Sequence, residues 1–176
     1  WDSFSKTLTE SSNEAKQKDL VICRDAHVEL FEAEVKKLTE KIRSMAYLPT
    51  SKSEEYFNKI AETRSSFKSD IGLAASSEEV AEIYGKALDI LCSIEISADT
   101  ENLTEYKEII ASALEDLKGD PKNYSTENYN TIIKIIKDAK ADLESIGSIP
   151  KCDSLLEDTK KRLALVNDLL DDAADR

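Results

Sequence analysis

The chain contains neither glycine nor proline between residues 3 and 48. These are the residues that most often end helices or form turns, so their absence favours one long helix or two helices joined end to end. Apolar side chains recur within this stretch at alternating steps of three and four, which is the spacing of one helix face. The residues on this face are Val28, Phe31, Val35, Leu38, Ile42 and Met45.

The amino-terminal part of the stretch has a weaker pattern, carried by Phe4, Leu8, Ser11 and Ala15. It predicts a shorter helix before the main one. The phase of the apolar positions changes at residues 19–23, which predicts a break or a stutter there.

The whole chain has four glycines and three prolines among 176 residues, too few for the many turns of a sheet protein. Its hydrophobic content of 40% is enough for a packed core and excludes the disordered class. The sequence therefore predicts an all-α fold.

Punctuating residues divide the chain into six predicted helical segments. Pro49 ends the first segment, Ser51 or Ser53 is expected to cap the second, and Gly72 is expected to end it. Ser76 with Glu79 then predicts a capping box at the start of the third.

No glycine or proline separates the third segment from the fourth, so a single continuous helix is the alternative to two. The break at Gly119 and Pro121 ends the fourth segment. The fifth begins near Ser125 or Thr126 and ends at Gly147. Pro150 then lies in the first turn of the sixth.

The two halves of the chain resemble each other. Tyr56 and Gly72 in the first half have counterparts in Tyr129 and Gly147 at nearly equal offsets. This pattern predicts two tandem three-helix bundles that form an elongated molecule and share a continuous central helix. The expected divisions are a helical extension at residues 1–22, a first bundle at 23–97 and a second at 98–176. The alternative is that any two helical hairpins look alike.

The chain is acidic, with 36 Asp and Glu against 24 Lys and Arg and a net charge of −12. Nucleic acids and anionic membranes attract clustered basic residues, so we expect neither as a partner. No apolar run is long enough for a transmembrane helix, so no membrane insertion is expected. The chain starts at Trp1, which suggests a removed leader or a piece of a longer protein.

The turn before the fifth segment reads Asn-Tyr-Ser-Thr-Glu-Asn-Tyr over residues 123–129. With the helix pattern of residues 25–170, it resembles the FIVAR modules of large bacterial surface and secreted proteins. The poorer counterpart lies at residues 51–56 and lacks the leading aromatic residue. The resemblance implies a tandem helical spacer or adhesion module that lies beside other domains. It carries over no functional residue.

Three cysteines allow at most one disulfide within the chain. Cys23 and Cys92 should lie far apart in an up-down-up bundle, whereas Cys92 and Cys152 both lie toward the joint between the halves. Cys92 with Cys152 is thus the predicted disulfide, and three unpaired thiols are the alternative. Without a Cys-x-x-Cys motif or a neighbouring histidine, no metal site is expected.

Two glycosylation sequons begin at Asn102 and Asn123, and both matter only in a secreted eukaryotic protein. Among the aromatic residues, Trp1 and Tyr124 are candidates for surface contacts with a protein or a sugar. The acidic run at residues 171–175 has the spacing of a magnesium-binding motif, but it is interpreted as a solvated face.

No motif pairs a nucleophile with a base, and the single His27 forms no catalytic triad, so we expect neither an enzyme nor a cofactor. The expected function is that of a spacer or interaction module, secreted or on the cell surface, which binds a protein or a glycan and is itself a monomer. Two alternatives stay open: a secreted carrier of a lipid or other small hydrophobic ligand, and a secreted parasite or arthropod protein that binds a host factor.

Overall fold

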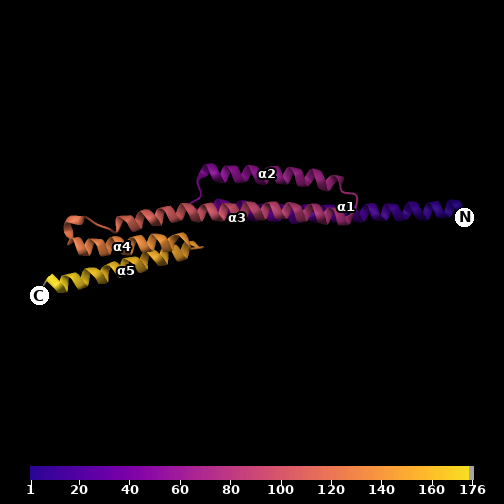
Figure 1. Ribbon diagram of the computed structural model, residues 1–176. Helices are drawn as coiled ribbons and strands as arrows, with labels where there is room; N and C mark the ends of the chain where they lie inside the picture. The colour runs from indigo at the N-terminus through magenta and orange to yellow at the C-terminus, as the bar shows by residue number, and fades with distance from the viewer. Residues whose placement is uncertain (175–176) are drawn as a thin grey trace. The chain divides into compact units, whose positions relative to one another are not determined.

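The computed structural model describes the backbone of residues 1–174 and the side chains of residues 1–167. Over this range the chain forms five α-helices, one short 3-10 helix and no strand, so the predicted all-α class is confirmed. Figure 1 shows the helices in chain order. They are α1 (Asp2–Ser44), α2 (Thr50–Leu73), α3 (Ser77–Asp116), the 3-10 helix η1 (Pro121–Asn123), α4 (Thr126–Glu144) and α5 (Ile149–Ala174).

The chain divides into two compact units, Trp1–Asp99 and Thr100–Arg176, here called unit 1 and unit 2. Helix α3 continues without a break from one unit into the next, so the alternative of a single helix in place of two predicted segments is confirmed. Its residues up to Asp99 belong to unit 1 and the later ones to unit 2. The tandem-bundle arrangement and the elongated shape stay predictions.

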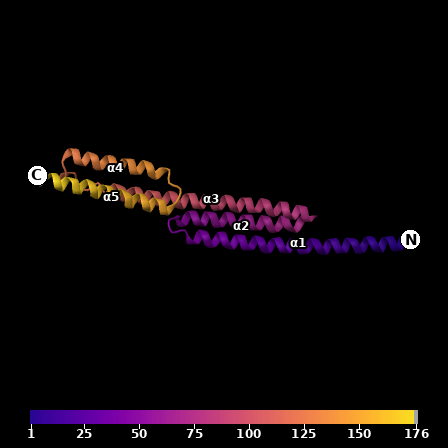
Figure 2. The ribbon, with the colours of Figure 1, turned by 90° about the horizontal axis from the view of Figure 1, so that it is seen from below.

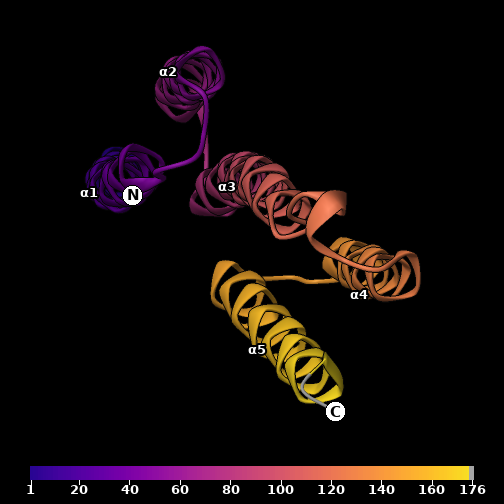
Figure 3. The ribbon, with the colours of Figure 1, turned by 90° about the vertical axis from the view of Figure 1, so that its left-hand side faces the viewer.

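Unit 1 has a core built from one face each of α1, α2 and α3, and Figure 3 shows these three helices end-on at the corners of a triangle. The rings of Phe31 and Phe67 meet at its centre with their centroids 4.1 Å apart. The α1 residues predicted from the alternating spacing are buried or half-buried here. The same periodicity that makes the helix amphipathic therefore selects its packing face.

Unit 2 has a core of its own, in which α4 and α5 lie side by side (Figure 2). Ile132, Ile136 and Leu143 of α4 are buried at helical spacing. Polar contacts connect the α3 residues of unit 2 to α4 and α5. Tyr106 donates a hydrogen bond to the Asp153 carboxylate, and Lys107 Nζ donates to the Glu144 carbonyl at 2.8 Å.

The helix starts confirm two of the predicted caps. The Ser76 hydroxyl accepts from the Glu79 amide at 3.2 Å, while the Glu79 carboxylate accepts from the Ala75 amide at 2.8 Å. The Ser125 hydroxyl accepts from the Asn128 amide at 3.2 Å and caps α4. Both serines satisfy amides that the first helical turn leaves without a partner.

Two predicted boundaries in unit 1 are wrong. Helix α2 begins at Thr50 after the N-cap Pro49, without a side-chain cap, and the Ser53 hydroxyl donates instead to the Thr50 carbonyl at 2.9 Å. Gly72 lies inside α2, which continues to Leu73. Gly72 has no left-handed backbone, and the C-cap residue Ala74 is extended, with its carbonyl accepting a hydrogen bond from Arg24 of α1.

The helix break predicted at Gly119 and Pro121 is confirmed. The φ of Gly119 is 67°, in the left-handed region that favours glycine, and a Cβ there would lie 3.4 Å from the Tyr124 ring. Pro121 then starts η1. The chain thus reverses between α3 and α4 at the position that glycine and proline mark in the sequence.

Candidate functional site

The amino-terminal part of α1 is exposed, and only residues 13–20 lie beside another part of unit 1, the turn at residues 75–78. Every residue from 1 to 19 is exposed, and the helix runs beyond the ends of α2 and α3 in both side views (Figures 1 and 2). Of the two alternatives at residues 19–23, a break or a stutter, the break is wrong, because α1 continues through them as one helix, and the separate short helix before them is wrong for the same reason. The change of phase instead moves the apolar residues to another face.

The exposed apolar residues of α1 form a line along the helix, here called the α1 stripe. Its large members are more than half exposed, from 53% for Leu30 to 104% for Trp1. Small exposed alanines continue the line between and beyond them. The α1 stripe consists of Trp1, Phe4, Leu8, Ala15, Ile22, Ala26, Leu30 and Ala33.

The α1 stripe faces away from the core of unit 1. Ile22 precedes the buried Phe31 by about two and a half helical turns, so the two side chains leave opposite sides of α1. Beside the stripe, Gln17, Lys18, Val21 and Ile22 line a shallow depression of about 360 Å³. Helix α1 therefore has two apolar faces, of which the core covers one.

Trp1 and Tyr124, the two predicted contact residues, have different surroundings. Trp1 is fully exposed at the N-cap of α1. Tyr124 is half-buried in unit 2, where its ring stacks on Tyr129 with centroids 6.2 Å apart. Because Tyr124 also covers Gly119, it anchors the turn between α3 and α4.

The two sequons lie in different local structures. Asn123 is exposed at the end of η1, outside the α-helices. Asn102 is half-buried within α3, where the Thr104 hydroxyl of its sequon donates to the Thr100 carbonyl at 2.8 Å. Glycans attach to accessible loop residues, so the surroundings of Asn123 suit the modification better.

All three cysteines are free thiols, so the predicted Cys92–Cys152 disulfide is not formed in this structure. Cys152 is buried in the core of unit 2, whereas Cys92 is exposed on α3 in unit 1. Burial raises the pKa of the Cys152 thiol and keeps it protonated, which makes it a small core residue and a poor nucleophile.

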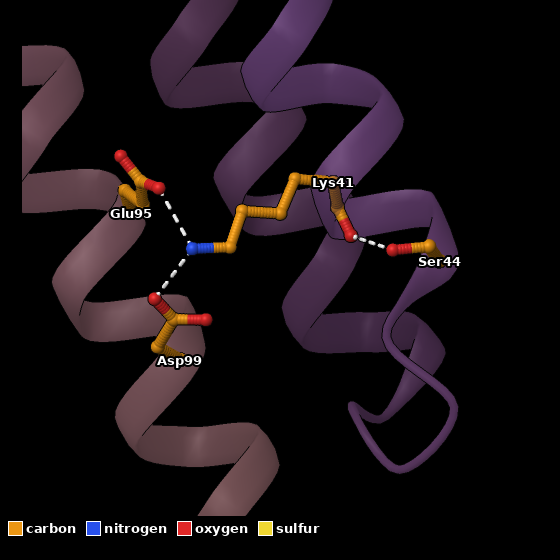
Figure 4. A network of polar contacts seen from close by, with 4 residues as sticks. All are labelled: Lys41, Ser44, Glu95 and Asp99. Atoms are coloured by element: carbon orange, nitrogen blue, oxygen red, sulfur yellow. Dashed lines mark hydrogen bonds and ion pairs between the residues drawn. The ribbon is translucent and has the colours of Figure 1, made fainter.

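Cys92 borders a groove of about 420 Å³ between α1 and α3 in unit 1. Leu38, Leu88 and Leu91 line the groove, and charged residues lie at its edges. One of them, Lys41, donates to Glu95 and Asp99 at 2.7 Å each (Figure 4). These contacts, with Asp99 the larger cause, raise the pKa of Lys41 and connect α1 to α3.

A second charged cluster connects α1 to α2. Glu32 accepts from Arg64 Nε at 2.8 Å and pairs with Lys68 Nζ at 3.1 Å. The hydrogen bond from Arg64, ahead of that from Lys68, lowers the pKa of Glu32 below its usual value. In unit 2, Glu115 pairs with Lys118 and Lys140 in the same way.

His27 is half-buried against Tyr84, and its Nδ1 lies 2.8 Å from the Cys23 carbonyl. This bond within α1 occupies the ring nitrogen nearest the Cys23 thiol. The described residues include no cluster of three histidine, cysteine or acidic side chains arranged to hold a metal ion. The acidic run at residues 171–175 lies outside the described side chains.

Sequence reasoning found only one end of the α1 stripe. It singled out Trp1 and assigned Phe4 and Leu8 to a weak helix of their own. The available signal was that the same spacing continues through Ala15 and Ile22 to Leu30. It was missed because the apolar positions from Val28 onward suggest a single packing face.

No helix in the described part of the chain is both long and apolar enough to cross a membrane. Comparisons with models of known protein families, with curated proteins and with solved structures find no match for this chain.

Proposed function

We propose that the protein is a non-catalytic helical interaction module that binds a partner protein through the α1 stripe. The single observation that carries the proposal is the exposure of Trp1, Phe4 and Leu8 on a helix segment without packing neighbours. Large apolar side chains gathered on one exposed face are typical of protein–protein contact sites. Burying each leucine-sized side chain is worth roughly 1.5–3 kcal/mol, a strong drive to cover the surface.

A protein suits this surface better than a glycan does. Sugars need hydrogen-bond partners beside the ring on which they stack, whereas Leu8, Ile22 and Leu30 are aliphatic. An amphipathic helix laid along α1 would match both the length and the chemistry of the α1 stripe. The core of unit 1 would then serve as the support that holds this helix.

Photo-crosslinking tests this function in intact cells. Phe4 is replaced by a photoreactive phenylalanine analogue, and irradiation is followed by mass spectrometry of the adducts. We expect a protein adduct from position 4 and none from the same analogue at the exposed position Asp138 in unit 2. If position 4 yields no protein adduct, the proposed function fails.

Secretion or display at the cell surface is also part of the proposal, supported by the resemblance to surface and secreted modules. Fractionation and protease treatment of intact cells test it. We expect the protein in the medium or in the protease-accessible fraction. Protection from protease until the cells are lysed would contradict this location.

A further inference from the structure

We infer that the partner on the α1 stripe is a second copy of this chain, with the two α1 helices packed antiparallel. The inference rests on the proposed function, since it names the occupant of the same surface. Three observations favour it: the apolar area exposed, the order of large and small residues and the exposure of the amino-terminal part of α1.

The apolar area of the α1 stripe is close to what a specific interface needs. The large side chains are Trp1, Phe4, Leu8, Ile22 and Leu30, each more than half exposed. Together they offer roughly 700 Å² per copy, judged from typical side-chain areas. A standard interface buries about 800 Å² per partner, so two stripes that face each other come near this size.

The order of residue sizes favours antiparallel pairing of the same helix. Three large residues lie at the amino-terminal end of the stripe, whereas large and small residues alternate at the other end. Antiparallel pairing centred on residue 17 sets Trp1 opposite Ala33, Phe4 opposite Leu30 and Leu8 opposite Ala26. Parallel pairing would set Trp1 against Trp1 and alanine against alanine, which crowds one end and leaves voids at the other.

Charged residues flank the α1 stripe. Residues 1–20 contain the four acids Asp2, Glu10, Glu14 and Asp19 and the three bases Lys6, Lys16 and Lys18. Residues 21–33 add three acids and one base, so the whole paired segment carries a net charge of −3. In the antiparallel register, Asp19 lies opposite Ala15 and therefore beside Lys16 of the other copy, a favourable contact.

The exposure of the amino-terminal part of α1 explains why this helix needs a partner. An isolated helix of this length is marginal in water, because most helix stability in proteins comes from packing of an apolar face. Residues 1–19 are all exposed, and the apolar stripe side chains among them have no cover within unit 1. A second α1 would pack against the apolar face of α1 that the core of unit 1 does not cover.

This dimer differs from the monomer expected of a helical interaction module. The α1 stripe is exposed in its own unit and is available to a second copy.

Mass and fluorescence measurements on the full chain test the pairing. Trp1 is the only tryptophan, so its emission reports on the α1 stripe directly. Sedimentation from micromolar to near-millimolar protein is expected to show the mass rising from one chain to two. The Trp1 emission should shift to the blue over the same range, as the ring leaves water.

Paired variants identify the surface. Phe4→Ser with Leu8→Ser should stay at the mass of one chain over the whole range, with circular dichroism showing that the bundles remain folded. Ile109→Ser with Leu165→Ser changes two exposed apolar residues of unit 2 and should dimerise like the parent. Equal dimerisation of both pairs would overturn the assignment to the α1 stripe.

Mixed crosslinking tests the register, in a background where Cys23 and Cys92 are replaced by serine. Leu8→Cys mixed with Ala26→Cys should form a disulfide between the two variants, whereas Leu8→Cys alone should not pair with itself. Pairing of Leu8→Cys with itself would overturn the antiparallel arrangement.

The outcomes separate this inference from the proposed function. If the chain keeps the mass of one copy at every concentration, and the photoreactive analogue at position 4 captures a different protein, the second copy is excluded while the interaction module stands. If the analogue captures no protein and the chain stays single, both fail.

Discussion

The contact between Phe31 and Phe67 holds α1 against α2 in unit 1. Both rings are nearly inaccessible to water, and their planes are tilted by 31°. Their positions follow from simple spacing, since each lies on the buried face of its own helix. At this scale the stability of the unit depends on a few fully buried side chains.

Phe67→Ala is expected to destabilise unit 1 by about 3–5 kcal/mol, because it removes buried surface and leaves a cavity beside Phe31. Chemical denaturation measures the change. Phe4→Ala is the matched control, since Phe4 is exposed and contributes nothing to the core. At low protein concentration its cost should stay within about 0.5 kcal/mol, and equal losses from the two variants would contradict the assigned core.

Glu32→Gln is expected to make the free energy of unfolding less dependent on pH in the acidic range. The lowered pKa means that the carboxylate stabilises the fold above the ordinary glutamate pKa, and that this gain is lost as the pH falls through the lowered folded pKa. The variant should lose less than about 1 kcal/mol at neutral pH, since the ion pairs are partly exposed.

The difference from the parent protein should vanish at a pH below the lowered pKa of Glu32. Denaturation curves collected from neutral to acidic pH measure this, and Glu40→Gln at an exposed position of α1 is the control. A constant difference at every pH would show that lost packing, and not the charge of Glu32, accounts for the change.

At the scale of the element, α3 and α4 begin where the sequence provides caps, α2 begins without one, and not every helix ends where the sequence provides glycine. Ser76 and Ser125 start α3 and α4 as expected. Gly72 fails to end α2, whereas Gly119 marks the turn after α3. A cap acts through neighbouring residues alone, whereas the C-cap residue of α2 also accepts a hydrogen bond from Arg24 of α1, a contact that local sequence does not reveal.

Ser76→Ala is expected to cost about 1 kcal/mol, because the Glu79 amide loses its acceptor at the start of α3. Thermal or chemical denaturation measures the loss. Ser77→Ala, one residue later and exposed, is the matched control and should be nearly neutral. A Ser76 variant as stable as the control would mean that water replaces the cap without loss.

At the scale of the whole molecule, the two units have separate cores although α3 runs through both. The cluster around Phe31 includes residues only up to Ala98, all in unit 1. Unit 2 buries its own set, with Ile136 inaccessible at its centre. Separate cores imply that each unit can open without the other.

Ile136→Ala is expected to weaken unit 2 by about 2–5 kcal/mol while the core of unit 1 is retained. Hydrogen exchange measured along the chain should lose protection in α4 and α5 and keep it in α2. Phe67→Ala gives the reciprocal pattern. A uniform loss of protection across all helices in either variant would show that the two units unfold together.

The sequence by itself determined that this protein is helical, where the breaks near Pro49 and Gly119 fall, and which residues cap α3 and α4. These features depend on spacing and on hydrogen bonds between near neighbours, so they can be read along the chain. Only the tertiary structure decided that α1 is a single helix with its first nineteen residues exposed, and that Cys152 is buried while Cys92 is not. Exposure depends on which helices lie alongside and where they end, and the spacing of apolar residues in α1 specifies two faces without saying which of them the core covers.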